Sequence, residues 1–184
     1  MGRKRIKYQS AYTLLEVMVV MSIVAILAAI AIPSYERYTI RAAQAQAKAD
    51  MLGIAGQLEN YRGKQLSYAN FTLEPKYNDA AGVFNIPYDS TVSNYKYQIR
   101  LLDLTAPTVG NVLGDRVPLN SSNATGRGWV MIAVPQQSAT AALKRANYLM
   151  ITSDGIRCMT PESSGSKTYS LDKNSTNCLD ALEW

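Results

Sequence analysis

Few residues of this 184-residue chain combine a reactive type with an informative position, and the first is Glu16. It directly precedes an uncharged run from Val17 to Ile32, in which Ser22 is the only polar side chain. A charged side chain in such a run costs about 3 kcal/mol at the middle of a bilayer and less near its surface. Two interpretations are open from the residues alone. Glu16 is wetted by lipid headgroups, or it pairs with a positive charge from another chain.

The second candidate is the pair Cys158 and Cys178, the two cysteines of the sequence. The sequence contains no histidine, so the usual zinc ligand sets are mostly excluded, and two thiols alone make a weak metal site. In an oxidising compartment two such cysteines favour a disulfide, which we predict here. We find no nucleotide-binding loop and no close group of carboxylates. We therefore expect no cofactor, no metal and no enzymatic activity.

The element that must position Glu16 is a long hydrophobic helix. The residues from Tyr12 to Ile32 would rise about 31 Å as a helix, which matches a hydrocarbon core of about 30 Å. A helix is required there because lipid offers the backbone no hydrogen-bond partners. Pro33 removes one backbone donor, and we expect it to kink the helix without ending it, since a helical pattern resumes beyond it.

The charge of the first residues predicts the orientation of this helix. Residues 1–11 contain Arg3, Lys4, Arg5 and Lys7 and no acid. Positive charge beside a first hydrophobic segment is held in the cytoplasm, so the chain after Pro33 should be exported. A general secretory signal peptide does not fit, because the apolar run is too long and no small-residue cleavage site follows it. Without residues 1–11 the net charge of +5 falls to about +1, which does not indicate nucleic-acid binding.

The pattern beyond Pro33 predicts a second half of the helix and then a sheet. Apolar residues recur at spacings of three and four from Tyr38 onward, which predicts an amphipathic helix half over residues 34–62 with Gly63 as its stop. After a long loop, alternating or apolar stretches predict strands over residues 95–101, 129–134, 147–152 and 156–159. The predicted fold is α+β. A long N-terminal helix, apolar over residues 12–33, packs its second half on an antiparallel sheet of about four strands within residues 63–184.

The residues around Glu16 resemble a known family. Ala11-Tyr12-Thr13-Leu14-Leu15-Glu16, followed by Val17-Met18-Val19-Val20, is similar to the prepilin signature of type IV pilins, usually written G-F-T-L-I-E before an apolar run. Pro33, the tyrosines at 35 and 38, the order of helix and sheet and the late cysteine pair also agree with that family. The C-terminal half resembles minor pilins of the PilE type through Gly155-Ile156-Arg157-Cys158 and the closing segment from Cys178 to Trp184.

This resemblance implies a prepilin whose leader is residues 1–11. A membrane aspartic peptidase would cut between Ala11 and Tyr12, and the new amine of Tyr12 would be N-methylated. Glu16 would then attract that amine of a neighbouring subunit during assembly. Ala11 stands where the family usually has glycine, and Tyr12 where it usually has phenylalanine. The implied partners are other pilin subunits, the prepilin peptidase, the inner-membrane assembly platform and, before assembly, membrane lipid.

The expected function is that of a structural subunit of a type IV pilus, and among such subunits a minor pilin. The protein would wait in the bacterial inner membrane with its C-terminal domain in the periplasm, and then enter a filament at the cell surface. Three alternatives are open: a type II secretion pseudopilin, a major pilin, and a single-pass anchored binding module without an assembly role. Adhesion, twitching motility and DNA uptake are outputs of a whole system that this sequence does not specify.

Overall fold

The computed structural model describes residues 12–73, 82–91, 93–106, 116–136, 143, 146–159 and 182–184. The chain divides into two compact units, Met1–Tyr38 and Thr39–Trp184, and we call the second unit the head. One helix, α1 (Leu14–Gln65), contributes residues to both units. It contains Pro33 within its length, as the sequence predicts. Residues 1–11, the predicted leader, lie outside the described residues.

The C-terminal end of α1 differs from the prediction. Gly63 does not end the helix, which continues to Gln65. A glycine inside a helix costs about 1 kcal/mol relative to alanine, and the following Lys64 and Gln65 are good helix formers that allow another half-turn. Leu66 directly follows the last helical residue; it has a φ of 59°, and its N–H donates to the Arg62 carbonyl at 2.7 Å. That geometry is the left-handed cap in which glycine or asparagine is the usual residue.

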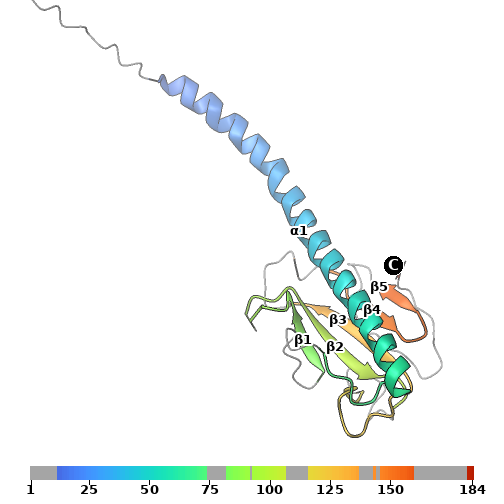
Figure 1. Cartoon of the computed structure of the whole chain (residues 1–184). Coiled ribbons are helices and arrows are strands. Elements are labelled where there is room, and N and C mark those ends of the chain that lie inside the picture. Colours follow the sequence, from blue (N-terminus) through green and yellow to red (C-terminus); the bar gives the residue numbers. More distant parts are fainter. Residues whose placement is uncertain are drawn as a thin grey trace, which may run out of the picture. The chain divides into compact units, whose positions relative to one another are not determined.

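The head contains a six-stranded sheet in the simple order β1 to β6, and every neighbouring pair is antiparallel. Its strands are β1 (Val83–Ile86), β2 (Tyr97–Asp103), β3 (Trp129–Pro135), β4 (Leu149–Thr152), β5 (Arg157–Met159) and β6 (Leu182–Glu183). Figure 1 shows β1 to β5 side by side, with the head part of α1 running across one face.

The four predicted strands are confirmed as β2 to β5, and the structure adds one strand at each edge of the sheet. β1 lies in the stretch where no periodicity dominates, and it is defined by pairing with β2, as in Phe84 opposite Ile99. β6 has two residues and is defined by pairing Leu182 with Met159 of β5. Strands this short are specified by their partner, so single-sequence periodicity could not find them.

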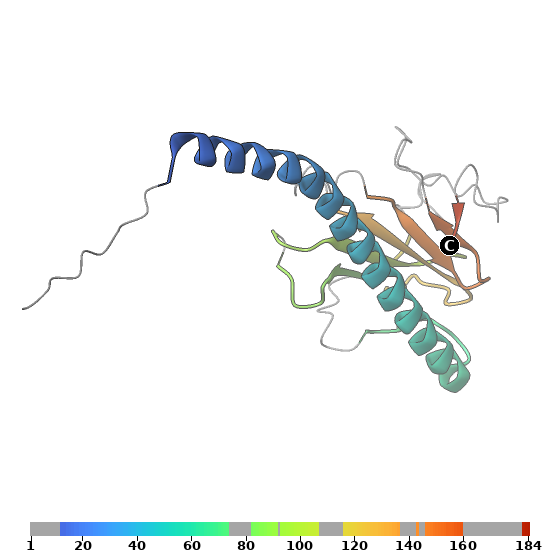
Figure 2. The same ribbon diagram turned by 90° about the horizontal axis from the view of Figure 1, so that it is seen from above.

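The main core lies between the head part of α1 and one face of the sheet. Figure 2 shows from above how this part of the helix crosses the sheet. The helix contributes residues spaced by three or four positions: Ile40, Ala43, Ala47, Met51, Ile54 and Leu58. The sheet contributes alternate residues, such as Tyr97, Ile99 and Leu101 of β2, all nearly or fully buried. Each element thus buries the face that its own periodicity makes apolar.

A second cluster of buried residues lies on the other face of the sheet. Leu102, Val130, Ile132, Met150 and Cys158 form it. The central strand β3 therefore has buried side chains on both faces, which explains why its sequence WVMIAV is apolar without alternation. Cys158 is disulfide-bonded. Its predicted partner, Cys178, lies outside the described residues, so the pairing stays a prediction.

Candidate functional site

The start of α1 is built by Thr13 and Glu16. The hydroxyl oxygen Oγ1 of Thr13 accepts a hydrogen bond from the Glu16 N–H at 3.2 Å, and the Thr13 carbonyl accepts one from Val17 N–H at 3.2 Å. Thr13 is therefore the N-cap of the helix, and Glu16 occupies the third helical position, where a carboxylate favours the positive end of the helix dipole. Tyr12, which would carry the new amine, is 81% exposed just before the cap.

This capping role was not part of the sequence prediction, although a signal for it is present. Thr-x-x-Glu before an apolar run is the pattern of a capping box. Within its own chain Glu16 thus takes part in the N-terminal cap of α1. Its role between subunits is a separate prediction. The role between subunits depends on the charge of the carboxylate, whereas the cap bond to Thr13 is made by the Glu16 backbone N–H.

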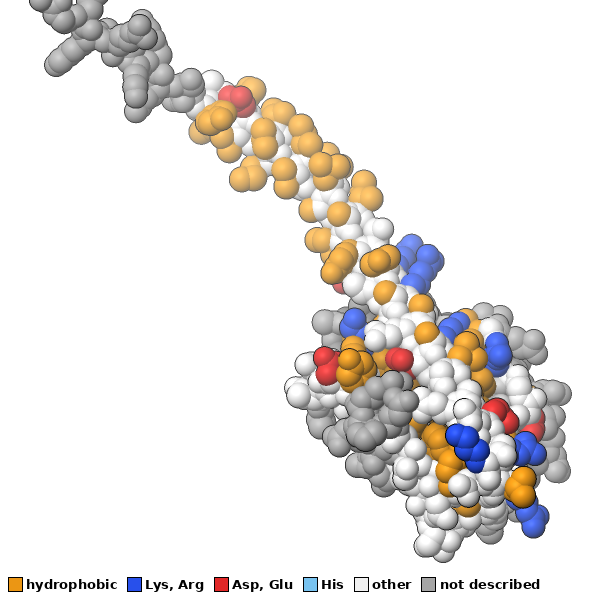
Figure 3. All heavy atoms as spheres, viewed as in Figure 1, with side chains coloured by type: hydrophobic (Ala, Val, Ile, Leu, Met, Phe, Trp, Pro, Cys, Tyr) orange, Lys and Arg blue, Asp and Glu red, His pale blue; other side chains and the backbone are white. Residues whose placement is uncertain are grey.

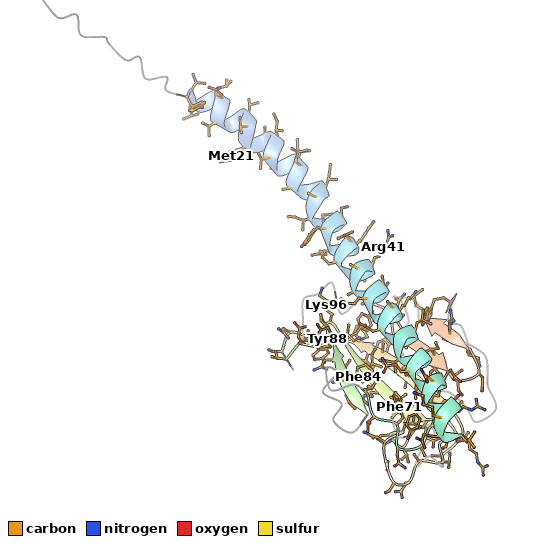
Figure 4. The ribbon with its side chains drawn as sticks, in the orientation of Figure 1. Met21, Arg41, Phe71, Phe84, Tyr88 and Lys96 are labelled. Atoms are coloured by element: carbon orange, nitrogen blue, oxygen red, sulfur yellow. The ribbon has the colours of Figure 1, made fainter. Side chains whose placement is uncertain are left out.

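The first half of α1 presents an apolar surface that nothing covers within the described residues. Its side chains from Leu14 to Tyr35 are mostly large and hydrophobic, and Leu14 and Ile30, for example, are 79% and 67% exposed. Among the described residues α1 is the one helix with a segment long and apolar enough to cross a membrane. Figure 3 shows hydrophobic side chains along this part of α1, and in Figure 4 Met21 points away from the helix.

The single polar side chain of the apolar run is satisfied within the helix. The Ser22 hydroxyl donates to the Val19 carbonyl at 2.7 Å, so it adds no unpaired donor to this surface. With Ser22 bonded in this way, the surface from Val17 to Ile32 suits a solvent that offers no hydrogen bonds. Such a surface fits a lipid bilayer or the apolar surfaces of other helices.

In the head, the most heavily bonded polar residue is Asp103, at the end of β2. It is fully buried, and its carboxylate accepts hydrogen bonds from the N–H groups of Thr105, Ala106, Thr125 and Gly126 and from the hydroxyls of both threonines. Burial alone raises the pKa of the Asp103 carboxyl, but these hydrogen bonds outweigh burial and hold the pKa below its ordinary value. Asp103 therefore ties the residues after β2 to those before β3.

Gly126 connects this Asp103 cluster to the loop that follows α1. Its carbonyl accepts the Tyr68 N–H at 2.9 Å, and its φ is +64°. A Cβ added at Gly126 would lie 2.3 Å from the Ala69 nitrogen, which is far inside contact distance. Glycine is therefore required for the close approach of these two loops.

The end of α1 carries a second polar group, formed by Glu59, Arg62 and Tyr68. The Tyr68 hydroxyl donates to Oε1 of Glu59 at 2.7 Å and accepts from Nη1 of Arg62 at 3.1 Å. Desolvation and the bond to Glu59 raise the pKa of the Tyr68 hydroxyl, so it stays protonated and can donate. This group fixes the loop that contains Leu66 against the last turns of the helix.

The C-terminal Trp184 contacts both α1 and β5 within the head. Its indole Nε1 donates to the Cys158 carbonyl at 2.9 Å. Lys48 Nζ lies 4.9 Å and Arg157 Cζ 5.8 Å from the ring centroid, within the range of cation–π contacts. Desolvation lowers the pKa of the Lys48 ammonium group. These contacts hold the edge of the sheet to the helix at the disulfide-bonded Cys158.

The predicted site residues are distributed over both units of the chain. Tyr12, Glu16 and Pro33 belong to the first unit, Cys158 belongs to β5 in the head, and Ala11 and Cys178 lie outside the described residues. Among the described residues there is no group of three or more His, Cys, Asp or Glu side chains that could hold a metal ion. The arrangement suits packing and assembly.

Known protein families match the chain both around the start of α1 and beyond Pro33. Residues 6–32 match the model of the prokaryotic N-terminal methylation motif. Residues 33–110 match the model described as type IV minor pilin ComP, DNA uptake sequence receptor. The two matches adjoin at Pro33 and together span more than half of the chain. This chain belongs to the type IV pilin family.

Curated relatives of this pilin include PilE proteins of Neisseria. A type IV major pilin protein PilE1 of Neisseria gonorrhoeae is 38% identical over 81 residues, covering 44% of this chain and 46% of the relative. A PilE major pilin of the same organism is 40% identical over 75 residues, or 41% of each chain. A fimbrial protein of Neisseria meningitidis is 39% identical over 75 residues, again 41% of each chain. The matched region thus spans less than half the length of these relatives. No solved structure matches the chain.

Proposed function

We propose that this pilin is a minor subunit of a type IV pilus, held in the inner membrane by the first half of α1 and then assembled into the filament. The observation that carries the proposal is the apolar surface of α1, on which no residue from Leu14 to Tyr38 is buried. Burying a large apolar side chain is worth about 1.5 to 3 kcal/mol relative to water, so this surface requires lipid or neighbouring helices. A filament subunit is surrounded by lipid before assembly and by the helices of neighbouring subunits afterwards.

The role of this chain in assembly is that of a substrate. A prepilin peptidase cuts between Ala11 and Tyr12, and the amine of Tyr12 is N-methylated before the assembly platform moves the subunit from lipid into the filament. There, neighbouring subunits replace the lipid around α1, and Glu16 attracts the Tyr12 amine of a neighbour. The positive charges of residues 1–11 keep that end in the cytoplasm before cleavage, which places the head in the periplasm.

The minor-pilin assignment follows the model matched by residues 33–110, whereas the PilE relatives are named as major pilins. A pseudopilin and a membrane-anchored binding module share the hydrophobic helix. A simple anchored module needs neither Glu16 at the third helical position nor a cleavage site in front of Tyr12. We expect no catalytic step on this chain.

Processing is the direct test of this proposal. The intact mass of the protein recovered from sheared filaments should correspond to residues 12–184 plus one methyl group, and a fraction of the same species should remain in the membrane. A cut further along the chain would remove part of the apolar surface that the helix needs. A protein that keeps Met1, or one cut after Ile32, would contradict the pilin assignment, and its absence from filaments would contradict the subunit role.

A second candidate function, DNA binding during uptake, is favoured by the match to the ComP model, whose description names a DNA uptake sequence receptor. The net charge of the mature chain does not indicate DNA binding, but recognition depends on local charge. The exposed cations among the described residues of the head are Arg41, Arg62, Lys64, Lys96, Arg127 and Arg157. In Figure 4, Lys96 and Tyr88 lie on the same side of the head, and both are exposed. An exposed cation such as Lys96 suits contact with a phosphate backbone.

DNA binding can be measured with the mature full chain in detergent. We expect affinity for duplex DNA that falls steeply as salt is raised, because phosphate contacts release counterions. Lys96→Gln should weaken binding to all duplex sequences and reduce the slope of log K against log salt by about 1. Asp154→Asn, an exposed change of similar size, should not weaken it. Absence of binding at low salt would exclude the receptor function and leave the subunit role standing.

A further inference from the structure

Leu66 has the most exposed large hydrophobic side chain in the described residues. It is 89% exposed, and its φ of 59° places it in the left-handed region that a leucine rarely adopts. The fold gains little from this side chain, because it buries almost no area and its backbone conformation suits glycine better. A residue whose backbone conformation is unfavourable and whose side chain adds little to stability is a candidate for a functional role.

A shallow hollow of about 380 Å³ lies beside Leu66. Glu59, Arg62, Gly63 and Leu66 line it. Gly63 leaves it open, since an added Cβ there would meet none of the neighbouring described atoms within 4 Å. The opposite charges of Glu59 and Arg62 are both bonded to the Tyr68 hydroxyl, so the wall of the hollow is close to neutral. A neutral hollow beside an exposed leucine suits an apolar side chain better than a phosphate or a metal ion.

The hollow continues an exposed face of α1 within the head. This face is opposite the buried one and repeats at spacings of three and four: Ala42, Ala45, Ala49, Leu52, Gly56, Glu59, Gly63 and Leu66. Its charges are Glu59 and Arg41, which is exposed and lies 18 residues, or five helical turns, before Glu59. In the first unit, the same helix exposes the apolar side chains that the proposed function places against neighbouring subunits. A partner on this face of the head would meet mostly small or apolar side chains, with one positive and one negative charge.

We propose that Leu66 and this hollow are a contact site for a neighbouring pilin subunit in the filament, with Leu66 as the apolar anchor and the hollow receiving an apolar side chain in return. The proposal rests on the proposed function of a filament subunit. The partner is another pilin because a helix face without net charge leads to the site, and because the site offers no excess positive charge for DNA.

The test separates the effect of Leu66 on folding from its effect on assembly. Leu66→Gly in the full chain removes the anchor and relieves the left-handed backbone, so the melting temperature of the purified protein in detergent should stay the same or rise. Its amount in sheared filaments, relative to the membrane fraction, should fall by about ten-fold, as expected for the loss of one buried leucine contact. Leu66→Met keeps the apolar volume and should restore incorporation to near the wild-type level.

Asn70→Gly is the matched control, because Asn70 is also exposed and has a φ of 60°. It relieves the same kind of backbone conformation without removing an apolar side chain, so its incorporation should be unchanged. Wild-type incorporation of Leu66→Gly, or an equal loss for Asn70→Gly, would overturn the contact and leave the proposed function intact. Absence of the wild-type protein from filaments would overturn the proposed function and the contact together.

Discussion

Replacing Asp103 by alanine should lower the free energy of unfolding of the head by about 3 to 5 kcal/mol. The carboxylate is fully buried and accepts from four N–H groups, which alanine would leave without their acceptor. Each buried donor that loses its partner costs about 1 to 3 kcal/mol, although relaxation and water recover part of the sum. A loss of this size is a large share of the 5 to 15 kcal/mol that stabilises an ordinary domain.

The same residue should make the stability of the head depend on pH under acidic conditions. The pKa of Asp103 is lower in the folded head than in the unfolded chain, so its contribution is complete above the unfolded pKa of about 4 and is lost as the pH falls through the folded pKa. Asp103→Asn, which cannot ionise, should be destabilised at neutral pH and should show a smaller further loss of stability below about pH 4.

Denaturant unfolding of the full chain in detergent, followed by tryptophan fluorescence, would measure both effects. Trp129 pairs with Asp103 across β2 and β3 and is 2% exposed, so its emission reports on this part of the head. Asp154→Ala is the control, because Asp154 is exposed in the turn between β4 and β5 and should change stability by less than about 0.5 kcal/mol. An Asp103→Ala variant as stable as this control would show that the hydrogen bonds of Asp103 are not needed.

The parts of the fold that the sequence predicted are those with a repeated pattern. The helix was predicted from an uncharged run followed by apolar residues at spacings of three and four, and β3 from an unbroken apolar stretch. β1 and β6 were missed because they are short and are defined by pairing with β2 and β5. The end of α1 was misplaced because Gly63 is a common stop signal, and the actual stop is a leucine in a conformation that leucine rarely adopts.

The parts of the site that the sequence predicted depend on a local motif. Tyr12 and Glu16 were singled out because the prepilin signature is contiguous, and their roles in processing and assembly stay predictions. The cap at Thr13 was missed, although its pattern is present in the same six residues. Asp103 could not be found, because its partners at positions 125 and 126 are distant in the sequence and meet it only after β2 and β3 have paired. Leu66 was also missed, since an exposed leucine becomes unusual only when its exposure and backbone conformation are known.

Glu16→Ala should abolish most entry of the protein into filaments while leaving the head intact. Glu16 belongs to the first unit, so the melting of the head should not change. The substitution makes the segment more apolar, and insertion in the membrane should be retained or improved. The attraction between this carboxylate and the Tyr12 amine of a neighbour would be lost. At 4 Å that attraction is about 1 kcal/mol in water and about 4 kcal/mol at an effective dielectric constant near 20.

The mutant should therefore accumulate as processed protein in the membrane, and its ratio of filament to membrane protein should fall by about ten-fold or more. Glu16→Gln separates charge from helix capping, because glutamine suits the third position of a capping box as glutamate does but carries no charge. If charge pairing drives assembly, the Glu16→Gln variant should enter filaments as rarely as the Glu16→Ala variant. Incorporation of Glu16→Gln alone at the wild-type level would assign Glu16 to the helix cap. Wild-type incorporation of both variants would make Glu16 an interfacial residue that lipid headgroups hydrate.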